Sequence, residues 1–293
     1  MATQKNKMSH ASWIGYVVLM SIGAFFVVLS AAFFITDGAL AVANVTTPGT
    51  GQWAETWMYL APAVAFLGTA LIVCALWIRV NGSFKTSVLF IFGLVSIFIG
   101  FICLVASSSF IVGNIAYVNT YAWMYPMIGL ALSMLGFILC FLGFRKVDIM
   151  SWAGLILAIL AIGLVISFYI LQILDFAGVF AWPVGGWESN TLRAIQFGAS
   201  GLILASLACY FLAATKNTSI TALRISGYIV MIAFAALFIA AIVFQTVVFA
   251  VWTTAPSVVT TTTELLMRSS QGAFFIGLLL TAFSTFTVQR KGK

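Results

Sequence analysis

The stretch SVLFIFGLVSIFIGFICLVASSS, residues 87–109, contains no charged side chain. A helix that crosses about 30 Å of hydrocarbon needs about 20 mostly apolar residues, and this stretch meets that length. Seven further runs of the same kind bring the total to eight, at approximately residues 12–36, 57–79, 87–109, 122–144, 150–173, 194–215, 226–252 and 269–289. The sequence therefore predicts an all-α polytopic membrane protein with eight transmembrane helices.

The overall composition agrees with this prediction. Of the 293 residues, 63% are hydrophobic and only 6% are charged, whereas soluble domains carry about 25% charged residues. So few charges cannot cover the surface of a protein in water, and the expected surroundings are a lipid bilayer. The first apolar run, preceded by Lys5 and Lys7, resembles a signal peptide. It is longer than an ordinary signal sequence, so we expect the first helix to be retained.

The charged residues predict the orientation in the membrane. With the N-terminus inside, Arg193 and Arg268 are outside and the other 11 of the 13 cations fall on the inner side: Lys5, Lys7, Arg79, Lys85, Arg145, Lys146, Lys216, Arg224, Arg290, Lys291 and Lys293. Of the six acids, only Asp148 falls inside, and the others are Asp37, Glu55, Asp175, Glu188 and Glu264. This asymmetry is typical of membrane insertion. We therefore expect both termini to be cytoplasmic, and the net charge of +7 indicates topology rather than a nucleic-acid partner.

Internal repeats are visible at fixed offsets. At an offset of 66, Trp57-Met58-Tyr59 aligns with Trp123-Met124-Tyr125. At an offset of 75, Arg193, Gln196 and Lys216 align with Arg268, Gln271 and Lys291, and fainter matches at an offset of 73 pair Gly154 and Gln172 with Gly227 and Gln245. The sequence predicts four tandem helical hairpins related as parallel pseudo-repeats. Residues 1–148 and 149–293 would be two four-helix units. Chance matching of apolar residues is the alternative.

The same alignment places Cys74, Cys140, Cys209 and Ser284 in one column. Two interpretations are open. Three cysteines on symmetry-related helices can converge on a metal ion, or the column can hold small side chains that let helices approach closely. Glycines such as Gly23, Gly68, Gly100, Gly136, Gly163 and Gly201 suit the packing role as well. We expect packing, and no metal.

The sequence lacks the residues on which most catalytic sites depend. The single histidine, His10, lies in the N-terminal tail. A bis-histidine haem and a serine or cysteine nucleophile with a histidine base are therefore excluded. The predicted spans contain no lysine and no acid near their middle, where pumps and transporters carry ionisable groups. We expect a protein that is not an enzyme and that binds no cofactor.

The remaining polar residues gather at the predicted outer ends of the helices in the second half of the chain. They are Glu188, Arg193, Gln196, Glu264, Arg268, Gln271, Gln172 and Gln245. If the hairpins pack as a ring, these residues can line an outer vestibule or dock a partner. Alternatively, the Glu–Arg pairs are salt bridges at helix ends, and the glutamine amides form hydrogen bonds between helices.

Two functions are compatible with these features. The first is a non-enzymatic structural or accessory subunit of a larger integral membrane complex, whose partners are other membrane subunits or further copies of this chain. The alternative is a channel or facilitator for a small neutral or weakly charged solute, because passive pores need no buried charge. Loop composition points to the cell membrane of a prokaryote, with an archaeon among the candidates.

Overall fold

The structure is a computed structural model that describes residues 9–43, 51–81, 87–112, 118–143, 149–177, 187–215, 220–251 and 257–286. Within these ranges, the side chains of residues 51–55, 110–112, 118–124, 176, 187–193, 245–251 and 257–261 lie outside the description. The described residues form eight helices, α1 (His10–Ala43), α2 (Gly51–Asn81), α3 (Val88–Val112), α4 (Val118–Gly143), α5 (Ile149–Phe176), α6 (Trp187–Ala214), α7 (Thr221–Val251) and α8 (Ser257–Phe283).

All eight helices are long and apolar enough to cross a membrane, which confirms the all-helical, multi-pass fold class. A bilayer offers no water to hydrogen-bond the backbone, so each crossing segment must satisfy its own amide and carbonyl groups, as a helix does. Pro62 lies inside α2 and Pro126 inside α4. Proline is tolerated in membrane helices where neighbouring groups accommodate the interrupted backbone.

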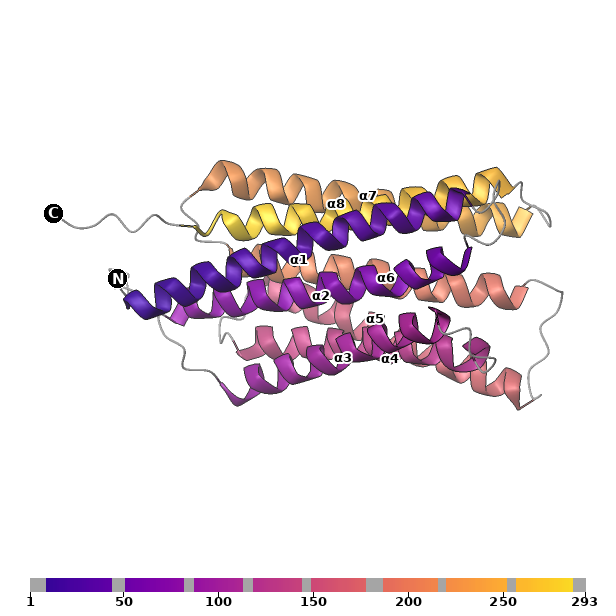
Figure 1. Ribbon diagram of the computed structural model, residues 1–293, viewed down its shortest axis with the longest axis horizontal. Coiled ribbons are helices and arrows are strands. Elements are labelled where there is room, and N and C mark those ends of the chain that lie inside the picture. Colours follow the sequence, from indigo (N-terminus) through magenta and orange to yellow (C-terminus); the bar gives the residue numbers. More distant parts are fainter. Residues whose placement is uncertain are drawn as a thin grey trace.

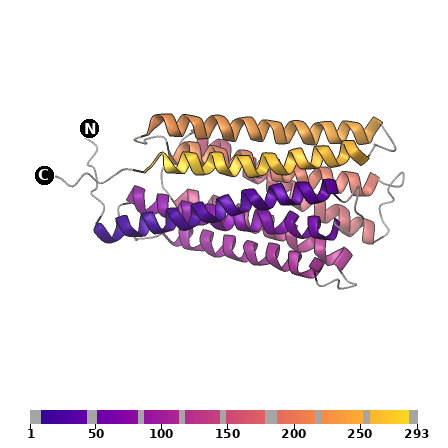
Figure 2. The ribbon, with the colours of Figure 1, turned by 45° about the horizontal axis from the view of Figure 1, so that its top comes forward.

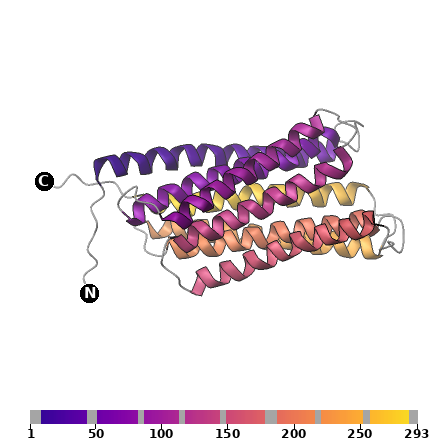
Figure 3. The ribbon, with the colours of Figure 1, turned by 90° about the horizontal axis from the view of Figure 1, so that it is seen from below.

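The helices run lengthwise beside one another, and α1 begins at the same end of the bundle at which α8 finishes (Figure 1). We call this the proximal end. The distal end is the opposite one, where α1 finishes and α2 begins. Two further views around the long axis show the same lengthwise arrangement (Figures 2 and 3).

The even-numbered helices form an inner ring. Contacts join α2 to α4, α4 to α6, α6 to α8 and α8 back to α2. Each odd-numbered helix packs against two of them: α1 against α8 and α2, α3 against α2 and α4, α5 against α4 and α6, and α7 against α6 and α8. In the stretch of each helix that is apolar enough to cross a membrane, 56–78% of the residues are buried for the inner helices, against 28–33% for the outer helices. The outer helices therefore present most of the surface that would face lipid.

Glycines set the closest approaches between outer and inner helices. A Cβ atom at Gly23 of α1 would lie 2.8 Å from the carbonyl oxygen of Gly68 on α2, and one at Gly136 of α4 would lie 2.5 Å from that of Gly93 on α3. A larger side chain cannot fit at these distances, so the predicted packing role of Gly23, Gly68 and Gly136 is confirmed. Gly163 is different, because nothing lies within 4 Å of the position that its Cβ would take.

Gly100 also has the predicted packing role, since a Cβ atom added at this position would lie 2.7 Å from the carbonyl oxygen of Gly129. Around Gly201, the nearest atoms to such a Cβ lie 3.4 Å away, which is an ordinary contact.

Phenylalanine side chains pack between neighbouring helices of the inner ring. The Phe66 ring of α2 lies 5.9 Å from the Phe137 ring of α4 and 6.3 Å from the Phe275 ring of α8. Phe141 of α4 contacts Phe211 of α6 at 6.1 Å between ring centroids. Edge-to-face and offset contacts at such distances are the favourable arrangements of aromatic pairs. These ring contacts join α8 to α2, α2 to α4 and α4 to α6.

Candidate functional site

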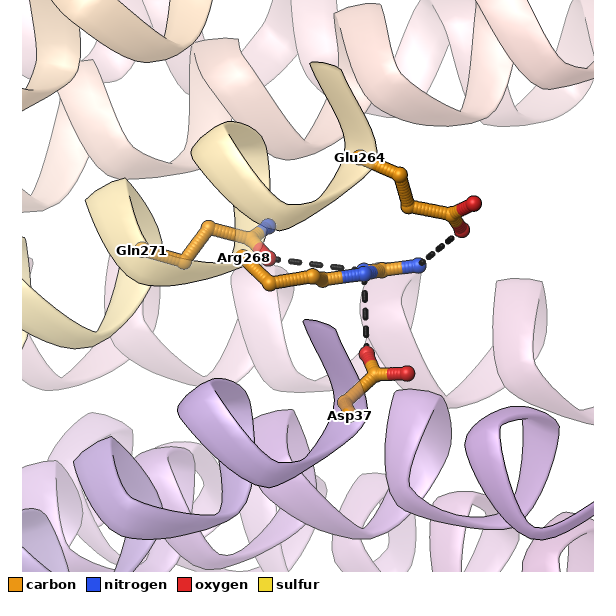
Figure 4. A network of polar contacts seen from close by, with 4 residues as sticks. All are labelled: Asp37, Glu264, Arg268 and Gln271. Atoms are coloured by element: carbon orange, nitrogen blue, oxygen red, sulfur yellow. Dashed lines mark hydrogen bonds and ion pairs between the residues drawn. The ribbon is translucent and has the colours of Figure 1, made fainter. Parts of the chain in front are cut away.

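Arg268 on α8 is the centre of a polar network near the distal end. Glu264, Arg268 and Gln271 follow one another at spacings of four and three residues, which places them on one face of the helix. Arg268 is only 4% exposed. Its Nη1 donates a long hydrogen bond of 3.4 Å to Oε1 of Gln271, and its Nη2 lies 3.8 Å from Oε1 of Glu264 (Figure 4). The predicted pairing of Glu264 with Arg268 is therefore present.

The strongest contact of Arg268 is with Asp37 of α1. Nε of Arg268 lies 2.8 Å from Oδ2 of Asp37, and both side chains are almost completely buried. Removing a charge from water is costly, and a partner of opposite charge offsets much of that cost. The pair thus ties the first helix of the chain to the last.

Glycine brings these two helices close enough for the pair to form. A Cβ atom at Gly38, the residue after Asp37, would lie 2.7 Å from Cδ1 of Leu265 and 3.5 Å from Cβ of Arg268. A side chain at position 38 would push α8 away from α1. The Asp37-Gly38 sequence therefore supplies both the charge and the space for the arginine.

Arg268 also contacts a third helix. Its guanidinium carbon lies 5.4 Å from the centre of the Phe197 ring on α6. A guanidinium over an aromatic face is an attractive arrangement, and it is stronger away from water. Through this residue the distal parts of α1, α6 and α8 are held together.

A cavity of about 40 Å³ lies beside this network, between the inner helices. Arg268, Gln271, Gln196 and Ser200 provide its polar lining. The apolar lining comes from α1, α2, α3, α4, α6 and α8 and includes Phe34, Phe66, Phe275 and both helix-interior prolines. The cavity is thus lined by segments far apart in the sequence.

The structure brings together three of the eight predicted site residues at this cavity, Gln196, Arg268 and Gln271. Glu264 contacts Arg268 but is partly exposed. Gln172 is half-buried on α5 and does not line the cavity. The side chains of Glu188, Arg193 and Gln245 lie outside the described residues.

Asp37 is the site residue that sequence reasoning missed. The first apolar run was predicted to finish near residue 36, which placed Asp37 in an outer loop. The helix instead continues to Ala43. The signal was the apolar segment Gly38–Ala43, GALAVA, directly after the aspartate. It allows the helix to continue and carries the carboxylate into the bundle.

The cysteine column has a packing role at Cys140. Its thiol is buried and lies 3.7 Å from the carbonyl oxygen of Phe90 on the neighbouring α3. At the aligned position in the last hairpin, Ser284, the residue directly after α8, donates a hydrogen bond of 2.6 Å to the carbonyl of Thr281 in α8. Within the described ranges, no group of three or more histidine, cysteine or acidic residues is arranged to hold a metal ion.

Comparisons of the chain with protein family models, with curated proteins and with solved structures find no match.

Proposed function

We propose that this protein is a non-enzymatic structural or accessory subunit of a larger integral membrane complex in the cell membrane. The observation that carries the proposal is that the contacts of Arg268 are with its own helix and with neighbouring helices of the bundle. This buried cation is ion-paired with Asp37 of α1, donates a hydrogen bond to Gln271 of α8 and packs on Phe197 of α6. A guanidinium committed in this way holds three helices together, which is a structural role, and it does not lose its proton to act as a base.

The outer helices supply the surface for association. Large apolar side chains are exposed along α3, α5 and α7, among them Phe98, Ile159 and Ile232. Such a surface suits lipid, and it suits the apolar face of a partner helix equally well. Where a partner covers it, van der Waals packing and the release of lipid contacts would drive association.

We further propose that both termini are cytoplasmic and that the chain consists of four parallel hairpin repeats. The charge asymmetry supports the orientation. Two equivalent contacts support the repeat in the second half. Gly154 of α5 lies against Ser206 of α6, and Gly227 of α7 lies against Thr281 of α8. Position 154 aligns with 227 at an offset of 73, and 206 aligns with 281 at 75, the offsets found in the sequence.

A channel for a small neutral or weakly charged solute is the second candidate. The cavity with its polar lining favours it, because a solute entering from the distal end would meet hydrogen-bonding groups there. The buried rings of Phe66, Phe137 and Phe275, which contact one another between neighbouring inner helices, weigh against it. A continuous pathway would require these rings to move apart.

The experiment that tests the proposal is purification from native membranes in mild detergent, followed by mass spectrometry of the proteins that remain bound. The accessory-subunit proposal predicts one or more partner membrane proteins in fixed stoichiometry. Purified protein without such partners would contradict it. Solute flux in reconstituted liposomes then tests the channel, and flux that disappears in Arg268→Ala at unchanged reconstitution would favour that candidate.

A further inference from the structure

Gln196 of α6 lines the cavity with a side-chain amide that the protein does not pair. The residue is 8% exposed. Within the described residues, it takes part in one hydrogen bond outside the helical backbone, and that bond uses its backbone carbonyl, which accepts from the hydroxyl of Ser200 at 3.0 Å. The side-chain amide has two donor hydrogens and an acceptor oxygen. All of them therefore need a partner from outside the described protein groups.

The amide of Gln271 on α8 is only half used. The residue is 7% exposed, and its Oε1 accepts from Nη1 of Arg268 at 3.4 Å. A guanidinium can only donate hydrogen bonds, so the amide turns its oxygen toward Arg268 and its NH₂ group away from it. Within the described part of the chain, this NH₂ group donates to no acceptor. Burying an amide without a hydrogen bond is costly, so both glutamines require an additional partner.

The unpaired groups of the two glutamines border open space. Some unpaired polar groups of the described bundle, such as the hydroxyl of Ser133, are completely closed off by protein atoms, but neither glutamine amide is among them. Because Gln196 and Gln271 both line the cavity, the open side of each amide borders it. The two residues align at an offset of 75 in the sequence. The cavity thus receives equivalent amides from two neighbouring helices of the inner ring.

The size and the charges of the cavity select its occupant. One water molecule requires roughly 10–15 Å³ of cavity volume, so a cavity of about 40 Å³ holds about three. Nε and Nη2 of Arg268 face Asp37 and Glu264, so its charge is compensated away from the glutamines and does not require an anion. An apolar occupant would leave both amides unpaired. Water donates and accepts, and a buried water typically bonds about three otherwise unpaired polar groups.

We propose that this cavity is a hydration site inside the bundle, in which a cluster of about three water molecules bridges the amides of Gln196 and Gln271. The waters accept from the NH₂ groups of both glutamines and donate to the side-chain oxygen of Gln196 and to the hydroxyl of Ser200. They join α6 to α8 through hydrogen bonds that the two glutamines do not make directly. The proposal goes beyond the accessory role proposed above and does not depend on it.

The test is radiolytic footprinting of the full-length protein in detergent. X-rays convert water into hydroxyl radicals, which oxidise side chains close to where they form, so a buried ring is modified when water lies beside it. Phe275 lines the cavity and Phe274 does not, although both rings are at most 1% exposed. Phe34 and Phe168 are a second pair, each 1% exposed, of which only Phe34 lines the cavity. In each pair, tandem mass spectrometry should show at least tenfold faster oxidation of the lining ring.

A variant and a matched control test whether the amide holds the water. Gln196→Leu removes the unpaired amide and leaves the Asp37–Arg268 pair in place, so it should slow the oxidation of Phe275 at least fivefold. Gln172→Leu removes a half-buried glutamine away from the cavity and should leave the rate unchanged. Circular dichroism checks that both variants are folded. If the lining rings of the wild type are oxidised no faster than Phe274 and Phe168, or if folded Gln196→Leu retains the wild-type rate, the proposal is wrong.

Discussion

Replacing Asp37 should destabilise this protein far more than replacing Glu264, although both carboxylates lie near the same arginine. The Asp37 oxygen is 2.8 Å from Nε of Arg268 and both side chains are at most 5% exposed. The Glu264 oxygen is 3.8 Å away and its side chain is 26% exposed. Losing one partner of a buried ion pair costs about 3–5 kcal/mol, whereas an exposed i,i+4 pair contributes about 0.5 kcal/mol or less.

The buried pair is best measured by a double-mutant cycle. Asp37→Leu alone leaves the buried Arg268 with only the partly exposed Glu264, 3.8 Å away, as a counter-charge, and Arg268→Met alone leaves Asp37 as a buried anion. Each single variant should therefore lose about 3–5 kcal/mol of unfolding free energy. The double variant replaces the pair by apolar side chains, so it should be more stable than the sum of the two losses predicts.

The assay is unfolding of the purified protein by increasing SDS in mixed micelles, followed by circular dichroism and tryptophan fluorescence. Glu264→Gln is the matched control, because it removes a charge near the same guanidinium at a partly exposed position. Equal losses for Asp37→Leu and Glu264→Gln, or additive losses in the double variant, would refute the reasoning.

The remaining predictions concern packing and orientation. Gly136→Ala should destabilise the protein by about 1–3 kcal/mol, because the added methyl group would lie 2.5 Å from a carbonyl oxygen of α3; Gly163→Ala, which meets nothing within 4 Å, should cause no measurable loss in the same SDS titration. For orientation, we introduce a cysteine at the exposed positions Asn81, at the proximal end, or Thr262, at the distal end. In intact cells a membrane-impermeant maleimide should label Thr262→Cys and spare Asn81→Cys, and the reverse pattern would show that the bundle is inserted the other way.

The sequence predicted the helices because one physical requirement dominates them. A segment that crosses hydrocarbon must be apolar and about 20 residues long, and all eight runs appear as helices in the structure. Spacing along the chain was also sufficient to predict the pairing of Glu264 with Arg268, because these residues lie one helical turn apart. These properties depend on neighbouring residues in the chain.

Contacts between distant helices were harder to predict. Asp37 and Arg268 are 231 positions apart in the sequence, and their pairing depends on the space beside Gly38. Whether a glutamine lines the cavity depends on how its helix is rotated within the bundle. Gln196 of α6 faces the cavity, whereas Gln172 of the outer helix α5 does not. When a helix is apolar on every side, its hydrophobic periodicity gives little evidence of which face is turned toward the interior of the bundle.

The accessory-subunit proposal is tested most directly by the mass of the particle extracted from native membranes in polymer-bounded nanodiscs. The chain alone has a mass of 31.6 kDa. The account predicts a protein mass that exceeds this value by the mass of at least one different chain, in constant ratio between preparations. A protein mass of 31.6 kDa, or an integer multiple of it, would contradict the account.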